Sequence, residues 1–132
     1  MIVESSALIA ILLKEPGYET VLDRLTTDDV VQVGAPTLVE TSMVLVARVG
    51  IVGKTLLARL LEEIEAEVID FTDAHRDAAV HAFVMYGKGR HPAGLNFGDC
   101  LTYAVARLSG ERLVCVGEDF PLTDVPLVVD GR

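Results

Sequence analysis

The sequence predicts an α/β fold in which a mainly parallel sheet of four to five strands is flanked by helices. Short apolar runs alternate along the chain with longer segments in which leucine, isoleucine and alanine recur at helical spacing. Glycine, proline and small polar residues separate the two kinds of segment. Strands that alternate with helices pair in parallel, because each helix carries the chain back across the sheet. With 132 residues and no linker-like stretch, the chain is expected to form a single domain, 1–132.

The expected strands cover residues 1–3, 30–33, 68–70 and 113–116, with a candidate edge strand at 126–129. Ser5 or Ser6 is expected to cap a helix that reaches residue 13, and further helices are expected over 18–25, 37–49 and 54–67. A further helix starts at Thr72 and reaches about residue 86, and Asn96 caps a helix that ends near Gly110. Between these last two helices lies a basic, glycine-rich loop, 87–94.

Composition narrows the class of protein. Hydrophobic residues make up 51% of the chain, which is enough for one core, and no apolar run is long enough to span a membrane. Glu4 interrupts the first apolar stretch, which argues against a signal peptide, and the two cysteines do not have metal-ligand spacing. We therefore expect a cytoplasmic protein with free thiols.

The net charge of −9 argues against nucleic-acid binding by bulk charge, unless an acidic site holds cations that reverse the local field.

Acidic residues follow the expected strands at the edge where α/β proteins bind ligands. Glu4 follows the first strand, and Glu40 lies in the first turn of the helix after the second. Asp99 opens the helix that leads to the fourth strand, while Glu118 and Asp119 follow that strand directly. Clustered carboxylates repel one another unless cations neutralise them, and Mg²⁺ and Mn²⁺ prefer oxygen ligands.

Each acid also has a purely structural interpretation. Thr37-x-x-Glu40 and Asn96-x-x-Asp99 both have the spacing of a helix capping box, and acids favour helix N-termini in general. Asp119 could be an ordinary turn residue. Glu4 is harder to explain in this way, because an acid between an apolar strand and an apolar helix needs a partner. The convergence of all these acids on one edge favours a site.

Lys88, Arg90 and His91 form the densest positive cluster in the acidic chain, directly before the Asp99 helix. Most such runs are simply solvated. Cations beside an acidic metal site would also suit a phosphodiester, whose phosphate they can hold.

Three stretches then resemble a known family. They are MIVESSALIAIL at residues 1–12, YGKGRHPAGLNFGDC at 86–100, and GEDF at 117–120 followed by Thr123 and Asp124. Together they resemble the VapC toxins, which are PIN-domain ribonucleases of VapBC toxin–antitoxin pairs. The central stretch is the most specific of the three, and the resemblance covers essentially the whole chain.

The resemblance implies a PIN fold and a metal-dependent endoribonuclease that uses one or two Mg²⁺ or Mn²⁺ ions. It implies RNA cleavage to 5′-phosphate and 3′-hydroxyl ends, a homodimer, and inhibition by a VapB-type antitoxin. Carried over by position, the catalytic and metal-binding acids are Glu4, Glu40, Asp99 and Asp119. Glu118 is an alternative to Asp119, and Ser6 occupies the position of a hydroxyl that supports the metal site. Lys88, Arg90 and His91 are the expected RNA contacts.

One departure keeps an alternative open. The family's first acid is normally aspartate, and here it is Glu4, whose carboxylate reaches about 1.5 Å further. The alternative function is therefore a catalytically weakened PIN module that mainly binds an antitoxin or RNA. A phosphotransfer domain is disfavoured, because its nucleophile would be an aspartate after the first strand.

Overall fold

The protein, described here from a computed structural model that covers residues 1–128, has a four-stranded sheet at its centre. The strands are β1 (Ile2–Val3), β2 (Gln32–Gly34), β3 (Glu67–Ile69) and β4 (Leu113–Val114). They are arranged in the order β3-β2-β1-β4, and every pair is parallel. This confirms the predicted α/β class and the parallel sheet.

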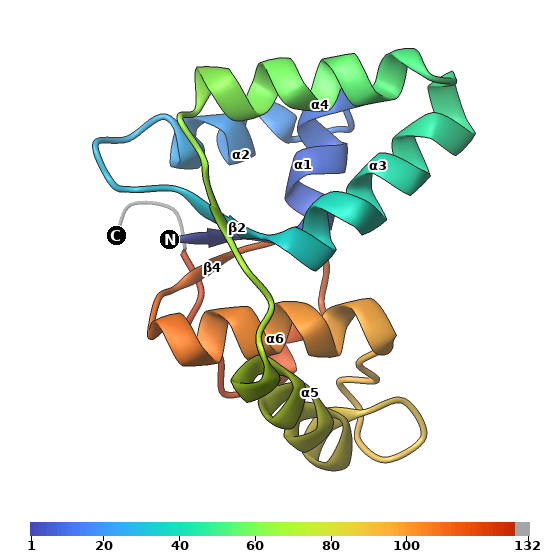
Figure 1. Ribbon diagram of the computed structural model, residues 1–132, viewed down its shortest axis with the longest axis vertical. Coiled ribbons are helices and arrows are strands. Elements are labelled where there is room, and N and C mark those ends of the chain that lie inside the picture. Colours follow the sequence, from blue (N-terminus) through green and yellow to red (C-terminus); the bar gives the residue numbers. More distant parts are fainter. Residues whose placement is uncertain (129–132) are drawn as a thin grey trace.

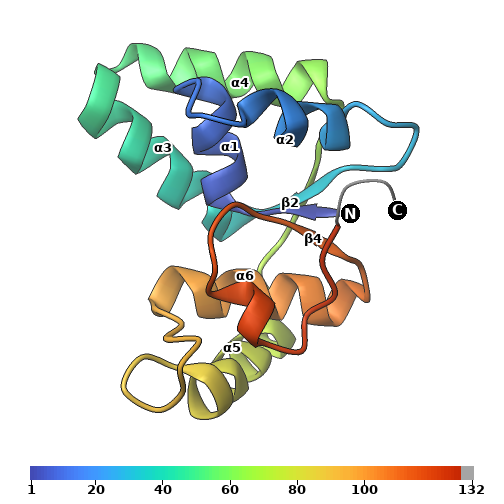
Figure 2. The ribbon, with the colours of Figure 1, turned by 180° about the vertical axis from the view of Figure 1, so that it is seen from behind.

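Helices cover both faces of the sheet (Figures 1 and 2). One layer contains α1 (Ser5–Leu12), α2 (Tyr18–Leu25), α3 (Ala35–Val49) and α4 (Val52–Glu63). The opposite layer contains α5 (Asp73–Tyr86) and α6 (Phe97–Ser109), and the short 3₁₀ helix η1 (Phe120–Leu122) follows β4. None of the helices within residues 1–128 combines the length and apolarity that a membrane crossing requires.

The strands separate two hydrophobic cores because successive side chains point to opposite faces of a sheet. Val3 and Val114 pack into the core under α1–α4, whereas their neighbours Ile2 and Leu113 pack into the core with α6. All four side chains are completely buried. The strands are short and apolar on both sides, as expected for a covered parallel sheet.

The predicted element types are correct, but several boundaries differ. Helix α3 begins at Ala35 rather than 37, because Gly34 is its N-cap and Pro36 fits the first turn of a helix. Helix α4 ends at Glu63 instead of 67, since the chain turns at Glu65 with a φ of +51°. Strands β1, β2 and β4 are shorter than predicted, while β3 keeps three residues but begins one residue earlier, at Glu67.

The candidate edge strand at 126–129 is reduced to a single parallel bridge between Leu127 and Leu113. Backbone hydrogen bonds link Leu113 to Pro126 and Val128 at 2.9 Å each. Val129 lies outside the described residues.

Because the strands are parallel, their carboxyl ends meet at one edge of the sheet. The chain leaves β1 for α1, β2 for α3 and β4 for η1 at this edge. The N-terminus of α6 lies beneath the start of α3 (Figure 1). This edge is where the predicted acids are found.

Candidate active site

Glu4 is a buried carboxylate at the junction of β1 and α1, with 5% of its surface exposed. The predicted cap at Ser5 or Ser6 is wrong: Glu4 itself is the N-cap residue of α1, and its Oε2 accepts a hydrogen bond from the Ser6 amide at 2.9 Å. Its Oε1 lies 2.9 Å from the Ser5 hydroxyl, and its Oε2 also contacts the Ser6 hydroxyl. The Ser6 amide therefore serves Oε2, and the Ser5 hydroxyl is within reach of Oε1, which explains how an acid is accommodated between two apolar segments.

Burial raises the pKa of the Glu4 carboxyl above its ordinary value, and the negative charge of Asp99 adds to this effect. Hydrogen bonds from Ser6 and Ser5 oppose the shift, because they stabilise the ionised form.

Ser6 connects this carboxylate to the end of β4. Its hydroxyl accepts a hydrogen bond from the Val116 amide at 2.9 Å and lies 2.7 Å from the Val116 carbonyl oxygen. A hydroxyl has a single hydrogen, so Ser6 donates either to the Val116 carbonyl or to Glu4. Ser6 therefore joins the start of α1 to the segment after β4, 110 residues further along the chain, and holds these two parts of the site together.

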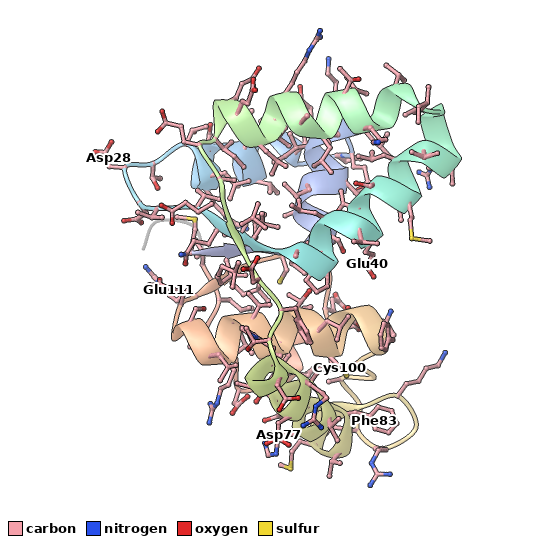
Figure 3. The ribbon with its side chains drawn as sticks, viewed as in Figure 1. Asp28, Glu40, Asp77, Phe83, Cys100 and Glu111 are labelled. Atoms are coloured by element: carbon pink, nitrogen blue, oxygen red, sulfur yellow. The ribbon has the colours of Figure 1, made fainter. Side chains whose placement is uncertain are left out.

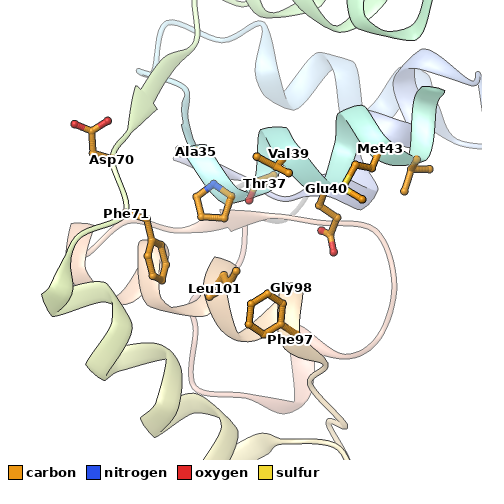
Figure 4. Close-up of a pocket in the computed structure, with 12 residues that line it drawn as sticks. Ala35, Thr37, Val39, Glu40, Met43, Asp70, Phe71, Phe97, Gly98 and Leu101 are labelled. Carbon is orange, nitrogen blue, oxygen red and sulfur yellow. The ribbon is translucent and has the colours of Figure 1, made fainter. Parts of the chain in front are cut away.

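Glu40 reaches the same region from the second turn of α3, rather than from the first turn as predicted. Its Oε1 lies 2.7 Å from the Ser5 hydroxyl, whose single hydrogen is donated either here or to Oε1 of Glu4. Its Oε2 lies so close to Gly98 that a Cβ atom there would be 2.1 Å away. Figures 3 and 4 show the side chain pointing from α3 toward the start of α6.

The capping-box interpretation of Thr37 and Glu40 is wrong. Gly34, not Thr37, is the N-cap of α3. The Thr37 side chain is buried, and its hydroxyl lies 3.2 Å from that of Thr102 on α6. Glu40 is therefore free of a capping role.

Asp99 does have the predicted capping role in α6. Its carboxylate accepts from the Asn96 amide at 3.0 Å, and the Asn96 side chain accepts from the Asp99 amide at 2.9 Å. Burial raises the pKa of the Asp99 carboxyl, and the negative charges of Asp119 and Glu40 raise it further. Asp99 is thus both a helix cap and the member of the acid cluster that interacts with all the others.

Asp119 and Glu118 lie in the exposed segment between β4 and η1. Asp119 is one of the charges that raise the pKa of Asp99, whereas Glu118 is not among them. The electrostatic interaction with Asp99 thus favours Asp119 over Glu118 as the fourth acid of the cluster.

The chemistry of this cluster fits a hard divalent cation. Carboxylate oxygens are the preferred ligands of such ions, and the mutual repulsion among Glu4, Asp99 and Asp119 is what a bound cation would relieve. Among residues 1–128, no three acidic, histidine or cysteine side chains are yet arranged around one point in the way that a bound ion requires. The donors are thus of the right kind, and ion binding would require the carboxylates to move around a common point.

The cysteines do not add a ligand. Cys100 and Cys115 are free thiols, as predicted. Burial raises the pKa of the Cys115 thiol to about 11, with the negative charges of Glu4 and Asp99 contributing. Cys115 therefore remains protonated and unreactive at neutral pH.

The basic loop is ordered mainly by its own backbone. Gly87 pairs with Leu95, and the Arg90 and His91 amides both donate to the Gly87 carbonyl oxygen, at 2.9 and 3.1 Å. Arg90 also turns back on α5, where its guanidinium lies 5.7 Å from the Phe83 ring centre.

The three predicted RNA contacts of this loop are not equivalent. The His91 ring accepts from the Ala93 amide at 3.0 Å and packs edge-on against Tyr86, so it has a structural role. Lys88 is exposed, and no side-chain contact is described for it. Lys88 is therefore the most available of the three to a ligand, whereas Arg90, although exposed, donates from its Nε to the Val84 carbonyl oxygen at 3.3 Å.

Two residues near the acids have contacts that the sequence analysis did not anticipate. Ser5 contacts both glutamates, and Gly98 leaves the space that Glu40 occupies. Ser5 could have been noticed as a polar residue at the buried start of an apolar helix, whereas the closeness of Gly98 to Glu40 depends on how α3 and α6 pack.

Comparison with known proteins gives a consistent result. The family model of the PIN domain matches residues 1–126. The chain is 46% identical to "Ribonuclease VapC36" of Mycobacterium tuberculosis, an alignment that covers 95% of this chain and 91% of that protein. It is 40% identical to "Ribonuclease VapC" of Mycolicibacterium smegmatis, with 97% of this chain and 99% of that protein covered.

A solved structure supports the fold independently. The crystal structure of VapC20 of M. tuberculosis, a toxin that cleaves the sarcin-ricin loop, superimposes with a TM-score of 0.77 over 96% of this chain and 97% of that one. At 21% sequence identity, this similarity establishes the shared fold alone. The family match and the relatives confirm the resemblance seen in the sequence: the chain belongs to the PIN-domain family, in the group of the VapC ribonucleases.

Proposed function

We propose that this protein is a divalent-metal-dependent endoribonuclease that acts as the toxin of a type II toxin–antitoxin pair. The observation that carries the proposal is the acid cluster at the carboxyl edge of the sheet. Glu4, Glu40, Asp99 and Asp119 come from four separate segments, and their charges influence one another. Independent capping or turn roles would not require such a convergence.

PIN-domain ribonucleases generally depend on a divalent metal ion. We assign Mg²⁺ or Mn²⁺ to this chain, held by Glu4, Asp99 and Asp119, with Glu40 as a further ligand or as support for a second ion. Such an ion, when bound, lowers the pKa of a water molecule and offsets negative charge on the phosphate. Ser6 would hold the Glu4 carboxylate in place through its contact with Val116.

The chain's own residues argue for hydrolysis by water rather than by a serine nucleophile. The Ser5 and Ser6 hydroxyls are both engaged with carboxylates, and no histidine contacts either of them among the described hydrogen bonds. In hydrolysis, the water oxygen forms a bond to phosphorus, and the bond from phosphorus to the 3′ oxygen breaks. The 3′ oxygen takes up a proton, which leaves 5′-phosphate and 3′-hydroxyl ends.

RNA binding in an acidic protein requires a local source of positive charge. Lys88 and Arg90 supply it on the loop that leads directly into α6 and Asp99. Long cationic side chains contact phosphates without fixed geometry, which suits an exposed loop.

Two partners follow from membership of the VapC group. We propose a VapB-type antitoxin as the inhibitor and a second copy of this chain as a stable partner. The surface we assign to the second copy is an apolar hollow of about 880 Å³ between α3, α6 and the segment before α5 (Figure 4). Val39, Met43 and Phe97 border it and are 60, 68 and 81% exposed. Large apolar side chains gathered on one face commonly mark an interface.

Activity is tested with the purified protein and a single-stranded RNA of mixed sequence. Cleavage is expected with Mg²⁺ or Mn²⁺ and not after chelation by EDTA, and the 5′ ends should be phosphorylated. The alternative, a weakened PIN module, predicts RNA or antitoxin binding without cleavage in either metal.

Dimer formation is tested by light scattering of the Met43→Glu protein. A charge in the apolar hollow should shift the protein from dimer to monomer at micromolar concentration. Val30→Glu, at a position that is also exposed but lies outside this face, is the matched control and should leave the dimer intact. A monomeric unmodified chain would contradict the proposal.

A further inference from the structure

The Ser5 hydroxyl lies between the two glutamates of the site. Its Oγ is 2.9 Å from Oε1 of Glu4 and 2.7 Å from Oε1 of Glu40. Ser5 is 6% exposed, so water has little access to this hydroxyl. The contact joins side chains that are 35 residues apart in sequence and belong to different helices.

The two serines of this turn have different contacts. The Ser6 hydroxyl links Glu4 to the backbone of Val116 after β4. The Ser5 hydroxyl instead links Glu4 to another acid, Glu40. A hydroxyl has a single hydrogen, so Ser5 donates to one carboxylate at a time, and its oxygen atom, packed between Oε1 of Glu4 and Oε1 of Glu40, sets how closely the two can approach.

Glu40 is held from its other side as well. Its Oε2 lies against the Cα of Gly98, at the first turn of α6 and next to Asp99. Movement of Glu40 is therefore restricted by Ser5 on α1 and by the backbone of α6. Loss of the Ser5 contact would leave the Glu40 carboxylate restrained on one side alone.

We propose that Ser5 is a positioning residue that holds the Glu4 and Glu40 carboxylates at a fixed separation for cation binding. This inference rests on the proposed function, since it concerns the same acids. It assigns to Ser5 a role that is separate from the support given by Ser6. The Ser5 hydroxyl acts through the two glutamates and does not itself contact RNA.

The main test is a double-mutant cycle read out as Mn²⁺ affinity by calorimetry. Ser5→Ala should weaken Mn²⁺ binding about tenfold, since a displacement near 1 Å of a site group has large effects. In a Glu40→Ala background the same change should cost no more than about twofold, because the shared partner is gone. Ser109→Ala is the matched control: that hydroxyl contacts carbonyl oxygens at the far end of α6, so its removal should not change affinity.

Equal losses in the two backgrounds, or no loss from Ser5→Ala, would overturn the positioning role. Cleavage rates of the same proteins should follow the same pattern, and circular dichroism should show the same helix content in all of them.

A second readout separates this inference from the proposed function. If the unmodified chain neither binds Mn²⁺ nor cleaves RNA, the proposed function fails. The role of Ser5 is then decided by the carboxyl ¹³C signal of Glu40 in the metal-free protein. Ser5→Ala should move this signal and Ser109→Ala should not, and an unmoved signal would overturn the inference.

Discussion

The acid cluster and the basic loop lie at the two sides of the α6 N-terminus and are built in opposite ways. The acids come from four segments that are distant in sequence, and Glu4 is in contact with the Ser5 hydroxyl and the Ser6 amide. The loop is one continuous stretch whose conformation depends on its own backbone bonds. Glu4 is buried, whereas Lys88 and Arg90 are exposed.

This difference matches the two functions proposed for these regions, which are cation binding and RNA binding. Groups that hold a cation at a reacting phosphate must keep their relative positions within a fraction of an ångström, which requires packing and hydrogen bonds from several elements. Groups that attract a phosphate backbone act through charge, which tolerates mobility and exposure. The comparison predicts that changes in the acid cluster abolish chemistry, while changes in the loop weaken binding by degrees.

The largest expected effect is that of Asp99→Asn. Asparagine can still accept from the Asn96 amide, so the capping box and the fold should survive. Its loss of charge removes a proposed cation ligand, and cleavage should fall by at least about a hundredfold. The measurement is the initial rate of RNA cleavage, together with thermal unfolding of the same sample.

The matched control for this change is Asp73→Asn, which alters an exposed acid in the first turn of α5. It should leave the rate unchanged. A folded Asp99→Asn protein with full activity would show that Asp99 serves only as a cap.

A smaller loss is expected for Glu4→Asp. The longer reach of Glu4 suggests from the sequence that its carboxylate is displaced and the site is distorted, and this distorted-site hypothesis predicts a gain of activity with Mg²⁺ from Glu4→Asp. The contacts of Glu4 with Ser5 and Ser6 argue for the opposite outcome, because a shorter side chain would give up part of them. We expect a decrease of about tenfold in the cleavage rate. Rates measured with Mg²⁺ and with Mn²⁺ decide the matter, and a gain with Mg²⁺ would restore the distorted-site hypothesis.

The same contrast, between a loop ordered by local contacts and acids brought together from distant segments, decides which features could be predicted from the sequence. Local rules were sufficient for the Asn96 cap, the glycine-rich loop and the order of strands and helices. They were insufficient at Pro36, which lies before the predicted helix 37–49 but belongs to the first turn of α3. Proline is common both in turns and in the first turn of a helix, and which of the two forms here depends on the backbone conformation of Gly34 at the end of β2.

The same division applies within the site. Parallel strands imply that Glu4, Glu40, Asp99 and Asp119 approach one edge, and this required no side-chain detail. The shared hydroxyl of Ser5 could not be predicted, because it depends on the rotamers of three side chains. The closeness of Gly98 to Glu40 likewise follows only from the packing of α3 against α6.

For the loop, we expect a graded effect from the double change Lys88→Gln and Arg90→Gln. RNA affinity should fall several-fold, and the dependence of affinity on salt should become flatter, by about one to two units in the log–log slope. The measurement is fluorescence anisotropy of labelled RNA at several salt concentrations. Both changes are made in the Asp99→Asn protein, so that the RNA is not cleaved during the measurement.

The paired change Lys54→Gln and Arg59→Gln is the control for the loop, since it removes the same two charges from the exposed surface of α4. An identical salt slope in the two double variants would mean that Lys88 and Arg90 are only solvated charges.

The smallest effect concerns the pH dependence of stability in the presence of EDTA. The pKa values of Glu4 and Asp99 are raised in the folded protein, mainly by burial. A carboxyl with a raised folded-state pKa favours folding while it is protonated, and this contribution is lost as the pH rises through that pKa. The metal-free protein should therefore become less stable between the ordinary titration range of carboxyl groups and neutral pH. In Glu4→Gln, which stays neutral and can still accept from Ser6, the decline should be shallower by no more than about 5 °C in Tm. Lys54→Gln is a control that should keep the full decline.

Thermal unfolding at several pH values tests this prediction, and identical pH profiles of the Glu4→Gln and unmodified proteins would show that burial of Glu4 carries no electrostatic cost. Because a bound cation removes the same cost, added Mn²⁺ should flatten the profile of the unmodified chain and should not change that of a protein with Glu4→Gln and Asp99→Asn combined.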